Sequence, residues 1–383
     1  MKDSPTSITM LFNSSDRRTL PGSESLPNLT CHSDHRVSVI FPVIFMTVGI
    51  TSNSLATGIL IKAYQRFRKK SKASFLLFAS GLVITDLFGH LINGAIAVFV
   101  YANNRDWIRI NQSNILCSIF GMCMVFFGLC PLLLGSVMAI ERCIGVTKPI
   151  FHSTKMTSKH VKVLLALVGL FALLIASLPI LSLRTYEVQA SRTWCFLKTE
   201  QVKEWADRCY LLLFSGLGML SLSTSFICNA VTGLTLIRVK IKNKQNRQGR
   251  SHHFEMIIQL LAIMCVSCIC WSPFLLTLTN IGIYGNNSKE TCKTVLYALR
   301  MATWNQILDP WVYILLRKAV LKKLYGIARS FCGGKVINLP SWELSSIKNS
   351  LKVSAISESP VSPKANKMSL TKTFSADTNL ELK

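Results

Sequence analysis

Seven long apolar stretches constrain the fold of this chain more than any other feature. When helical, each is long enough to cross a hydrocarbon layer of roughly 30 Å, because a helix rises about 1.5 Å per residue. They lie at about 37–61, 74–101, 115–141, 162–183, 209–237, 256–281 and 294–316. Hydrophobic residues make up 50% of the chain and charged residues only 16%, which suits a bilayer better than water. We therefore predict an all-α membrane protein, a bundle of seven transmembrane helices.

The distribution of charge predicts the orientation. The formal net charge is +25, but it is divided among short connections, which argues against a continuous surface for nucleic acid. Basic residues follow the first, third and fifth stretches: Lys62, Arg66, Arg68, Lys69, Lys70, Lys72; Arg142, Lys148, Lys155, Lys159; Arg238, Lys240, Lys242, Lys244, Arg247, Arg250. Such connections stay in the cytoplasm. The opposite side holds the glycosylation sequons, at Asn13, Asn28, Asn111 and Asn286. Both signals predict a multi-pass plasma-membrane protein with its N-terminus extracellular and its C-terminus cytoplasmic.

The two ends of the chain differ from the bundle of residues 37–316. Residues 1–36 are expected to be a glycosylated extracellular segment without a cleavable signal peptide. Residues 317–332 are expected to form a short amphipathic eighth helix on membrane lipid, with basic residues on the side opposite Val320, Leu321, Leu324 and Ile327. Cys332 is a palmitoylation candidate, with an ordinary thiol as the alternative. Residues 333–383 are expected to be a disordered, phosphorylated cytoplasmic tail.

Cysteines on the extracellular side are the candidates for disulfides, because that compartment is oxidising. Cys117 begins the third stretch and Cys195 lies midway along the second outer loop, so a bridge between them would pin the loop over the bundle. Cys31 and Cys292 are the candidates for a second bridge, from the N-terminal segment to the third outer loop. Cys209 makes the count odd and leaves this second pairing open.

Few ionisable side chains lie within the apolar stretches, and these are functional candidates because charge is costly in a bilayer. Asp86 and Asp309 lie near the polar side chains Asn53 and Asn305. We expect the two carboxylates to share a sodium ion or a proton, and the alternative is a polar packing network. No other cofactor or metal is expected.

Arg300 is the most informative single residue. Counting along the helices from their cytoplasmic ends places Arg300 and His90 about 25 Å deep, Asp86 about 20 Å and Asp309 about 10 Å. No carboxylate shares the depth of Arg300, and a guanidinium stays charged. We therefore predict an anionic ligand group beside it, with snorkelling to the headgroups as the alternative. Since the third stretch has no Asp to pair with an amine, an apolar cavity with one fixed cation suits a fatty acid.

Three motifs predict the parts that switch. Glu141 and Arg142 stand side by side at the cytoplasmic end of the third stretch, where a partner could break a resting pair between them. Pro273 removes a backbone hydrogen bond beside Trp271 and is expected to kink the sixth helix. The seventh stretch repeats this arrangement near its cytoplasmic end, with Asp309, Pro310 and Tyr313.

Taken in order, the motifs resemble those of rhodopsin-like G-protein-coupled receptors over residues 37–330. They are Asn53, residues 82–86, Cys117, Glu141-Arg142-Cys143, Cys270-Trp271-Ser272-Pro273 and Asp309-Pro310-x-x-Tyr313. Within that class, residues 193–196 and 299–311 resemble the prostanoid receptors. The resemblance also supports a disulfide between Cys117 and Cys195.

This resemblance implies a prostaglandin receptor and not an enzyme. Arg300 and Thr193 would hold the ligand carboxylate, and Tyr101 would assist from the top of the second helix. His90 would face the ring hydroxyls, and the apolar chains would be lined by Met124, Trp271 and Phe274. The resemblance further implies coupling mainly to a heterotrimeric G protein of the Gq class, which raises inositol phosphates and calcium. Kinases and arrestin would act at the tail.

Other functions fit the residues less well. A zinc hydrolase would need several ligands at one depth, and His90 is the one histidine within the seven apolar stretches. A retinal pump would need a Lys in the seventh helix. A transporter is a weaker alternative, because no repeat of two related halves is visible. A receptor for another prostanoid or acidic lipid is the nearest alternative.

Overall fold

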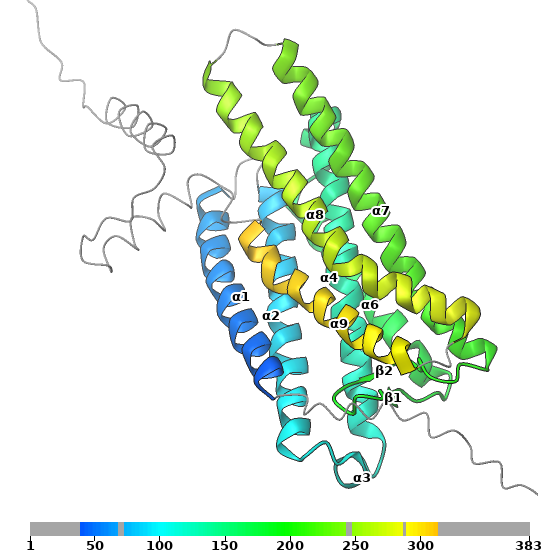
Figure 1. The fold of residues 1–383 in the computed structure, drawn as a ribbon. Coiled ribbons are helices and arrows are strands. Elements are labelled where there is room, and N and C mark those ends of the chain that lie inside the picture. The colour runs from blue at the N-terminus through cyan, green and yellow to red at the C-terminus, as the bar shows by residue number, and fades with distance from the viewer. Residues whose placement is uncertain (1–38, 68–72, 243–246, 286–288, 313–383) are drawn as a thin grey trace, which may run out of the picture. The chain divides into compact units, whose positions relative to one another are not determined.

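Seven long helices dominate the computed structural model, which describes residues 39–67, 73–242, 247–285 and 289–312 (Figure 1). They are α1 (Ile40–Phe67), α2 (Ala73–Ala102), α4 (Ile115–Thr147), α6 (Ser158–Leu181), α7 (Trp205–Lys242), α8 (Arg247–Tyr284) and α9 (Lys289–Pro310). Each contains most of one apolar stretch, so the seven-helix prediction is confirmed. The eighth helix, Tyr313 and the tail lie outside the described residues, as does all of the separate unit Leu324–Lys383.

Six of the described helices have the length and hydropathy of membrane spans: α1, α2, α4, α6, α7 and α8. Helix α9 differs because Lys293, Arg300 and Asp309 lie within its 22 residues and lower its mean hydropathy. Its packing places it in the bundle nevertheless, since it contacts α8, α1 and α2. Lys293 is exposed, but Arg300 is half-buried and Asp309 is buried in the bundle, where the cost of burying a charge implies a use.

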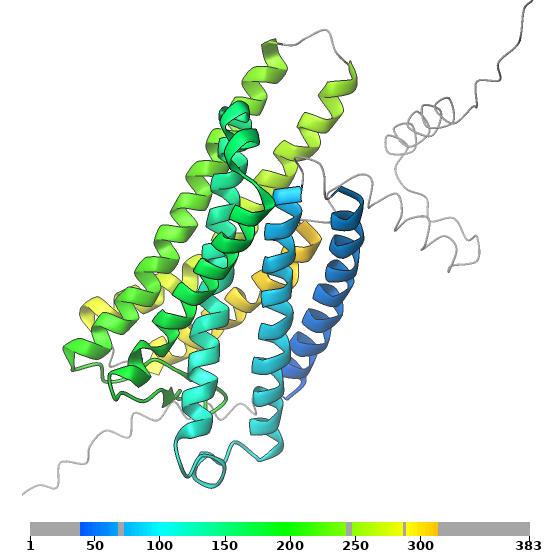
Figure 2. The ribbon, with the colours of Figure 1, turned by 180° about the vertical axis from the view of Figure 1, so that it is seen from behind.

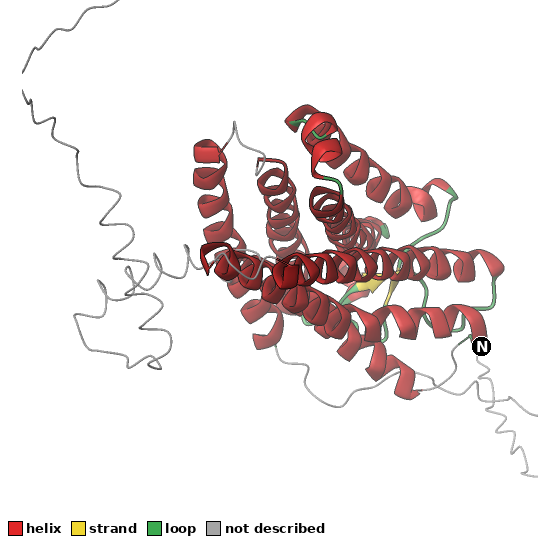
Figure 3. Ribbon diagram, turned by 90° about the horizontal axis from the view of Figure 1, so that it is seen from above, coloured by secondary structure: helices red, strands yellow, loops and turns green. Residues whose placement is uncertain are grey.

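Within the described residues, the connections contain two minor helices and, in the long connection of residues 182–204, one hairpin. Helix α3 (Trp107–Ile110) follows α2, and α5 (Pro149–Lys155) follows α4. Strands β1 (Glu187–Val188) and β2 (Cys195–Phe196) pair antiparallel, with Val188 opposite Cys195. Figure 3 shows these strands as the small yellow element among red helices. We call the end of the bundle with α3 and the hairpin the hairpin end, and the end with α5 the α5 end (Figures 1 and 2).

Helix α4 is central to the packing and contacts α2, α6, α7, α5 and β2. Two buried apolar clusters form around it. One joins α4 to the hairpin, α7, α8 and α9, and it includes Phe120, Phe196, Phe214 and Trp271. The other joins α4 to α1, α2 and α6, and it includes Leu60, Phe78, Leu134 and Met138. The bundle thus has an aromatic core toward the hairpin end and an aliphatic-rich core toward the α5 end.

Candidate functional site

A cavity of about 160 Å³ lies between α1, α2, α4, α7, α8, α9 and the hairpin. Aromatic rings form much of its wall. The Phe196 ring of β2 lies 5.3 Å from the ring of Phe214 and 5.7 Å from that of Phe274, measured between centroids. The sequence-based site omitted Phe214, because the direction in which a phenylalanine of an apolar helix points depends on how the helices pack.

All seven ligand-site residues predicted from the sequence line this one cavity: Arg300, Thr193, Tyr101, His90, Met124, Trp271 and Phe274. They come from four helices and the loop segment between the two strands, up to 210 positions apart in the chain (300 − 90 = 210). The structure therefore brings the predicted set together in space. That these residues bind a ligand stays a prediction.

Arg300 lies in an aromatic setting. Its guanidinium carbon is 4.2 Å from the ring centroid of Phe41 on α1 and 5.9 Å from that of Tyr297. The Tyr101 hydroxyl lies within the electrostatic range of Arg300 and near the Thr193 side chain. No ion pair involves Arg300 among the residues that the structure describes. A guanidinium stacked on an aromatic ring keeps its full charge. Arg300, Tyr101 and Thr193 therefore form a polar, positively charged mouth on an apolar cavity.

The structure corrects one estimate, that Arg300 and His90 share a depth. Arg300 stacks on Phe41, whereas the His90 ring packs against Gly49, where an added Cβ would lie 2.4 Å from the ring. Phe41 and Gly49 are eight residues apart on α1, which separates the two levels by about 12 Å. Counting residues failed because it assumes that every helix stands at the same height and angle in the membrane. The cavity consequently has a cationic end and, deeper in, a neutral polar wall.

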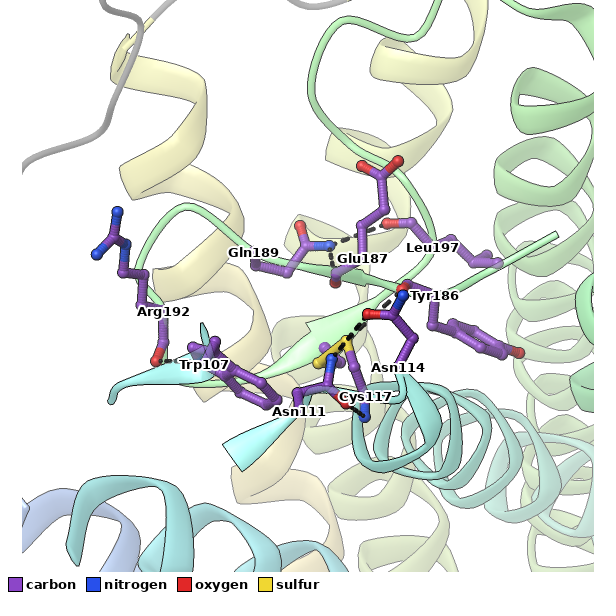
Figure 4. The surroundings of a disulfide bond; sticks show 10 residues. Trp107, Asn111, Asn114, Cys117, Tyr186, Glu187, Gln189, Arg192 and Leu197 are labelled. Atoms are coloured by element: carbon purple, nitrogen blue, oxygen red, sulfur yellow. Dashed lines mark hydrogen bonds between the residues drawn. A yellow bond between two sulfur atoms is a disulfide. The ribbon is translucent and has the colours of Figure 1, made fainter. Parts of the chain in front are cut away.

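The hairpin closes the cavity and is attached to α4 by a disulfide (Figure 4). Cys117 and Cys195 are bonded, with Cα atoms 5.5 Å apart, so this predicted pairing is confirmed. On α3, the Trp107 indole N–H donates to the Arg192 carbonyl oxygen at 2.9 Å. Arg192 immediately precedes Thr193, so the loop residue predicted to bind the carboxylate is held from both sides.

Asn111, the one predicted glycosylation site that the structure describes, is hydrogen-bonded at the start of α4 (Figure 4). Its side-chain oxygen accepts from the Cys117 N–H at 3.1 Å, and its Nδ2 donates to the Asn114 Oδ1 at 3.2 Å. The Nδ2 atom that a glycan would occupy is thus part of the loop structure. Glycosylation here stays a prediction, and Asn13, Asn28 and Asn286 lie outside the described residues.

Charged groups of the second loop pair close to the hairpin. The Lys198 ammonium lies 3.0 Å from a Glu187 carboxylate oxygen, and this hydrogen bond raises the pKa of Lys198. Burial raises the pKa of the Glu200 carboxyl, and a hydrogen bond from the Cys292 thiol at 3.8 Å opposes the shift.

The second predicted disulfide, between Cys31 and Cys292, is untested because Cys31 lies outside the described residues.

The predicted carboxylate pair lies deep in the bundle. Asp86 is fully buried, and both of its carboxylate oxygens have no hydrogen-bond partner among the described residues. Asp309 accepts a hydrogen bond from the Asn305 amide at 2.9 Å and lies close enough to Asp86 for electrostatic repulsion. The Asn53 side-chain oxygen is buried without a partner as well. Sharing of a sodium ion or a proton by Asp86 and Asp309 stays a prediction.

At the α5 end, the acidic residue of the Glu141-Arg142 motif contacts the loop helix. A Glu141 carboxylate oxygen lies 2.8 Å from the His152 Nε2 of α5, and both side chains are buried. The Arg142 guanidinium carbon lies 4.4 Å from the ring centroid of Phe75 on α2. Sequence reasoning missed His152, since nothing in its local sequence indicates that α5 folds back on α4. Trp271, Pro273 and Pro310 lie inside α8 and α9 as predicted, and their switching role stays a prediction.

A seven-helix bundle with a disulfide-pinned hairpin over a cavity is the architecture of a membrane receptor. Comparison with protein-family models agrees, because residues 56–313 match the 7 transmembrane receptor (rhodopsin family). The chain belongs to the rhodopsin family of seven-transmembrane receptors, which are multi-pass membrane proteins and not enzymes.

Known relatives narrow the comparison. The chain is 72% identical to the prostaglandin F2-alpha receptor of Homo sapiens over 356 residues, which cover 93% of this chain and 99% of the relative. It is 70% identical to the prostaglandin F2-alpha receptor of Mus musculus over 355 residues, 93% of this chain and 97% of the relative. Identity to the prostaglandin E2 receptor EP1 subtype of Canis lupus familiaris is 36% over 364 residues, 82% and 89% of the two chains. The predicted resemblance to prostanoid receptors is confirmed.

Proposed function

We propose that this chain is a plasma-membrane receptor for a prostaglandin, most specifically prostaglandin F2-alpha, with its N-terminus outside the cell and its C-terminus inside. One structural observation carries the proposal: a fixed cation, Arg300, stands at the mouth of an apolar cavity beside Tyr101 and Thr193. A fatty acid with a polar ring matches such a cavity at its carboxylate and along its chains. The 72% identity to a prostaglandin F2-alpha receptor supports the particular ligand.

Each residue of the cavity then has a task. The guanidinium of Arg300 forms a two-pronged contact with the ligand carboxylate, which suits its planar geometry. Tyr101 and Thr193 donate hydroxyl hydrogen bonds to the same carboxylate. His90 faces the ring, and Met124, Trp271 and Phe274 surround the apolar chains. Because Trp271 lies two residues before Pro273 in α8, a ligand pressing on its indole could change the bend of that helix.

The signalling side follows from the same topology. We propose that the α5 end faces the cytoplasm, where Arg142 and α5 meet a heterotrimeric G protein, mainly of the Gq class. Kinases and arrestin would then act on the tail. Transfected cells should show prostaglandin-dependent inositol phosphate and calcium release. Specific binding without that response would contradict the Gq coupling, and agonist-independent solute flux would favour a transporter.

Replacing Arg300 tests the binding site. We expect Arg300→Ala to weaken prostaglandin F2-alpha binding by about tenfold or more, because a charge-assisted hydrogen bond contributes about 1.5–3 kcal/mol. Radioligand binding on membranes, corrected for surface expression, measures the effect. Arg300→Lys should bind more tightly than Arg300→Ala but less tightly than the unsubstituted protein, because lysine keeps the positive charge and lacks the two-pronged geometry of the guanidinium.

Arg109→Ala is the matched control for Arg300→Ala. Arg109 is an exposed arginine of α3 at the same end of the bundle, and it does not line the cavity. Unchanged affinity in Arg300→Ala, or an equal loss in both variants, would rule out Arg300 as the carboxylate site.

A further inference from the structure

The deep wall of the cavity carries two buried polar atoms that have no partner among the described residues. They are the Nε2 of His90 and the Oδ1 of Asn93, and both residues line the cavity from α2. Residues three apart on a helix share a face, so the two atoms belong to one polar patch. A buried polar atom without a partner destabilises a protein. The patch is therefore a place where a ligand atom would gain a hydrogen bond.

Of the other buried polar atoms of the cavity, the Trp271 Nε1 also has no partner among the described residues, but an indole N–H is a donor only. Several of the remaining polar side chains have partners of their own. Gln306 donates from its Nε2 to the Phe127 carbonyl oxygen at 2.7 Å, and Thr303 donates to the Leu299 carbonyl oxygen at 3.0 Å. Tyr101 and Thr193 lie near each other at the mouth. His90 is 5% exposed and its ring is set against Gly49, which limits its rotation. Asn93 and His90 are thus the polar groups best placed to serve a ligand in the depth of the cavity.

The distance from the cationic mouth fits the proposed ligand. Asn93 precedes Tyr101 by eight residues on α2 and therefore lies about 12 Å from Tyr101 along the helix axis, toward the α5 end. His90 lies about 16 Å from Tyr101 in the same direction. In a prostaglandin, seven bonds separate the carboxylate carbon from the ring, and an extended chain advances roughly 3.5 Å for every three bonds. The oxygen of the nearer ring hydroxyl is two bonds further out, nine bonds from the carboxylate carbon, and is therefore roughly 10 Å from it. With the carboxylate at Arg300, ring hydroxyls reach the level of Asn93 first.

We propose that Asn93 is a further ligand-binding residue and that, with His90, it selects a ring hydroxyl over a ring ketone. The proposal rests on the proposed prostaglandin function. A hydroxyl donates to the Asn93 oxygen and accepts from the imidazole at the same time, whereas a ketone only accepts. A ketone in this place leaves the Asn93 oxygen without a donor. F-type prostaglandins carry two ring hydroxyls, E-type ones a ketone in place of the first, and D-type ones a ketone in place of the second.

Competition binding with prostaglandins F2-alpha, E2 and D2 on membranes that contain the full chain tests this selection. In the unsubstituted protein, at least one ketone ligand should bind about tenfold more weakly than prostaglandin F2-alpha. Asn93→Leu, which keeps the side-chain volume, should weaken prostaglandin F2-alpha about tenfold and leave that ketone ligand within about twofold. Asn103→Leu is the control, because Asn103 lies on the turn after α2 and does not line the cavity.

Two results would overturn the selection. One is that Asn93→Leu leaves the ratio of affinities between the hydroxyl and ketone ligands unchanged. The other is that all three ligands bind the unsubstituted protein equally, which needs no variant and holds even if Asn93→Leu does not fold. Arg300→Ala separates the two proposals, because it should weaken all three ligands alike through their shared carboxylate. Absence of specific prostaglandin F2-alpha binding to the unsubstituted protein would instead refute the proposed function.

Discussion

The two ends of α4 hold their loops in different ways. At the hairpin end, a disulfide from Cys117 to Cys195 attaches the second loop covalently. At the α5 end, the contact from Glu141 to His152 attaches α5 through a hydrogen bond at 2.8 Å. A covalent bond keeps a binding cavity in one shape, whereas a hydrogen bond can be broken by a partner. The same helix thus carries a permanent attachment beside the proposed ligand site and a reversible one beside the proposed G-protein site.

The packing beside each attachment shows the same difference. Tyr186, just before the hairpin, is 4% exposed, and its hydroxyl donates to the Ala176 carbonyl oxygen of α6 at 2.7 Å. Burial raises the pKa of this phenol, so it stays a donor at physiological pH. On α5, by contrast, Ile150 and Phe151 are 80% and 52% exposed. Large exposed apolar side chains at a helix are typical of a surface that a partner covers.

The largest effect is expected from breaking the covalent attachment. Cys117→Ser and Cys195→Ser should each abolish ligand binding or surface delivery, because loss of a native disulfide typically costs about 2–5 kcal/mol. The double variant should be no worse than either single one, since all three lack the same bond. Surface labelling and radioligand binding measure this.

Cys209→Ser is the control for the cysteine variants, because Cys209 is an exposed cysteine outside any disulfide at the same end. Normal binding by both Cys117→Ser and Cys195→Ser would show that the bond is dispensable for the cavity.

An intermediate effect is expected where α4 and the second loop are held together by non-covalent packing, at Gly121 and Tyr186. An added Cβ at Gly121 would lie 2.4 Å from the Tyr186 ring and 2.6 Å from its Cβ, so the root of a buried side chain would have to move. Gly121→Ala should lower stability by about 1–3 kcal/mol and reduce ligand affinity. Thermal unfolding of the purified receptor in detergent measures the stability.

Gly135→Ala on the same helix is the matched control, since nothing lies within 4 Å of a Cβ there. Its stability should be unchanged or slightly higher, because alanine favours helix. Equal losses in the two variants would mean that contact with Tyr186 is unimportant.

The smallest effect is expected at the α5 end. His152→Ala should leave ligand affinity unchanged and lower agonist potency in calcium release by roughly three- to tenfold, because α5 loses a hydrogen bond worth about 1 kcal/mol. His160→Ala is the control, since His160 in the first turn of α6 is exposed and bonds to its near neighbours Thr157 and Lys155. Glu141→Gln combined with His152→Ala completes a double-mutant cycle. Strictly additive effects would show that the pair does not act as a unit.

Part of the site was predictable from the residues alone, because a charged side chain within a membrane carries an unusual energetic cost. Arg300, Asp86 and Asp309 stand out in apolar helices, and prolines mark the bends. Asn93 and His152 did not stand out in the sequence, because an asparagine in a helix and a histidine in a connection between helices are both common. Their significance appears when Asn93 is found with an unpaired oxygen in the cavity and His152 is found against Glu141.

By itself, the sequence determined the seven helices, their order and the confirmed pairing of Cys117 with Cys195. Charge cost singled out Arg300, and the resemblance to prostanoid receptors implied the other six cavity-lining residues predicted for the ligand. The helices follow from hydropathy, which is a local property. Only the tertiary structure decided the depth of each group, including the separation of Arg300 from His90. It also decided which loop contacts which helix. The physical reason is that heights, tilts and faces of helices depend on packing between segments that are distant in the chain.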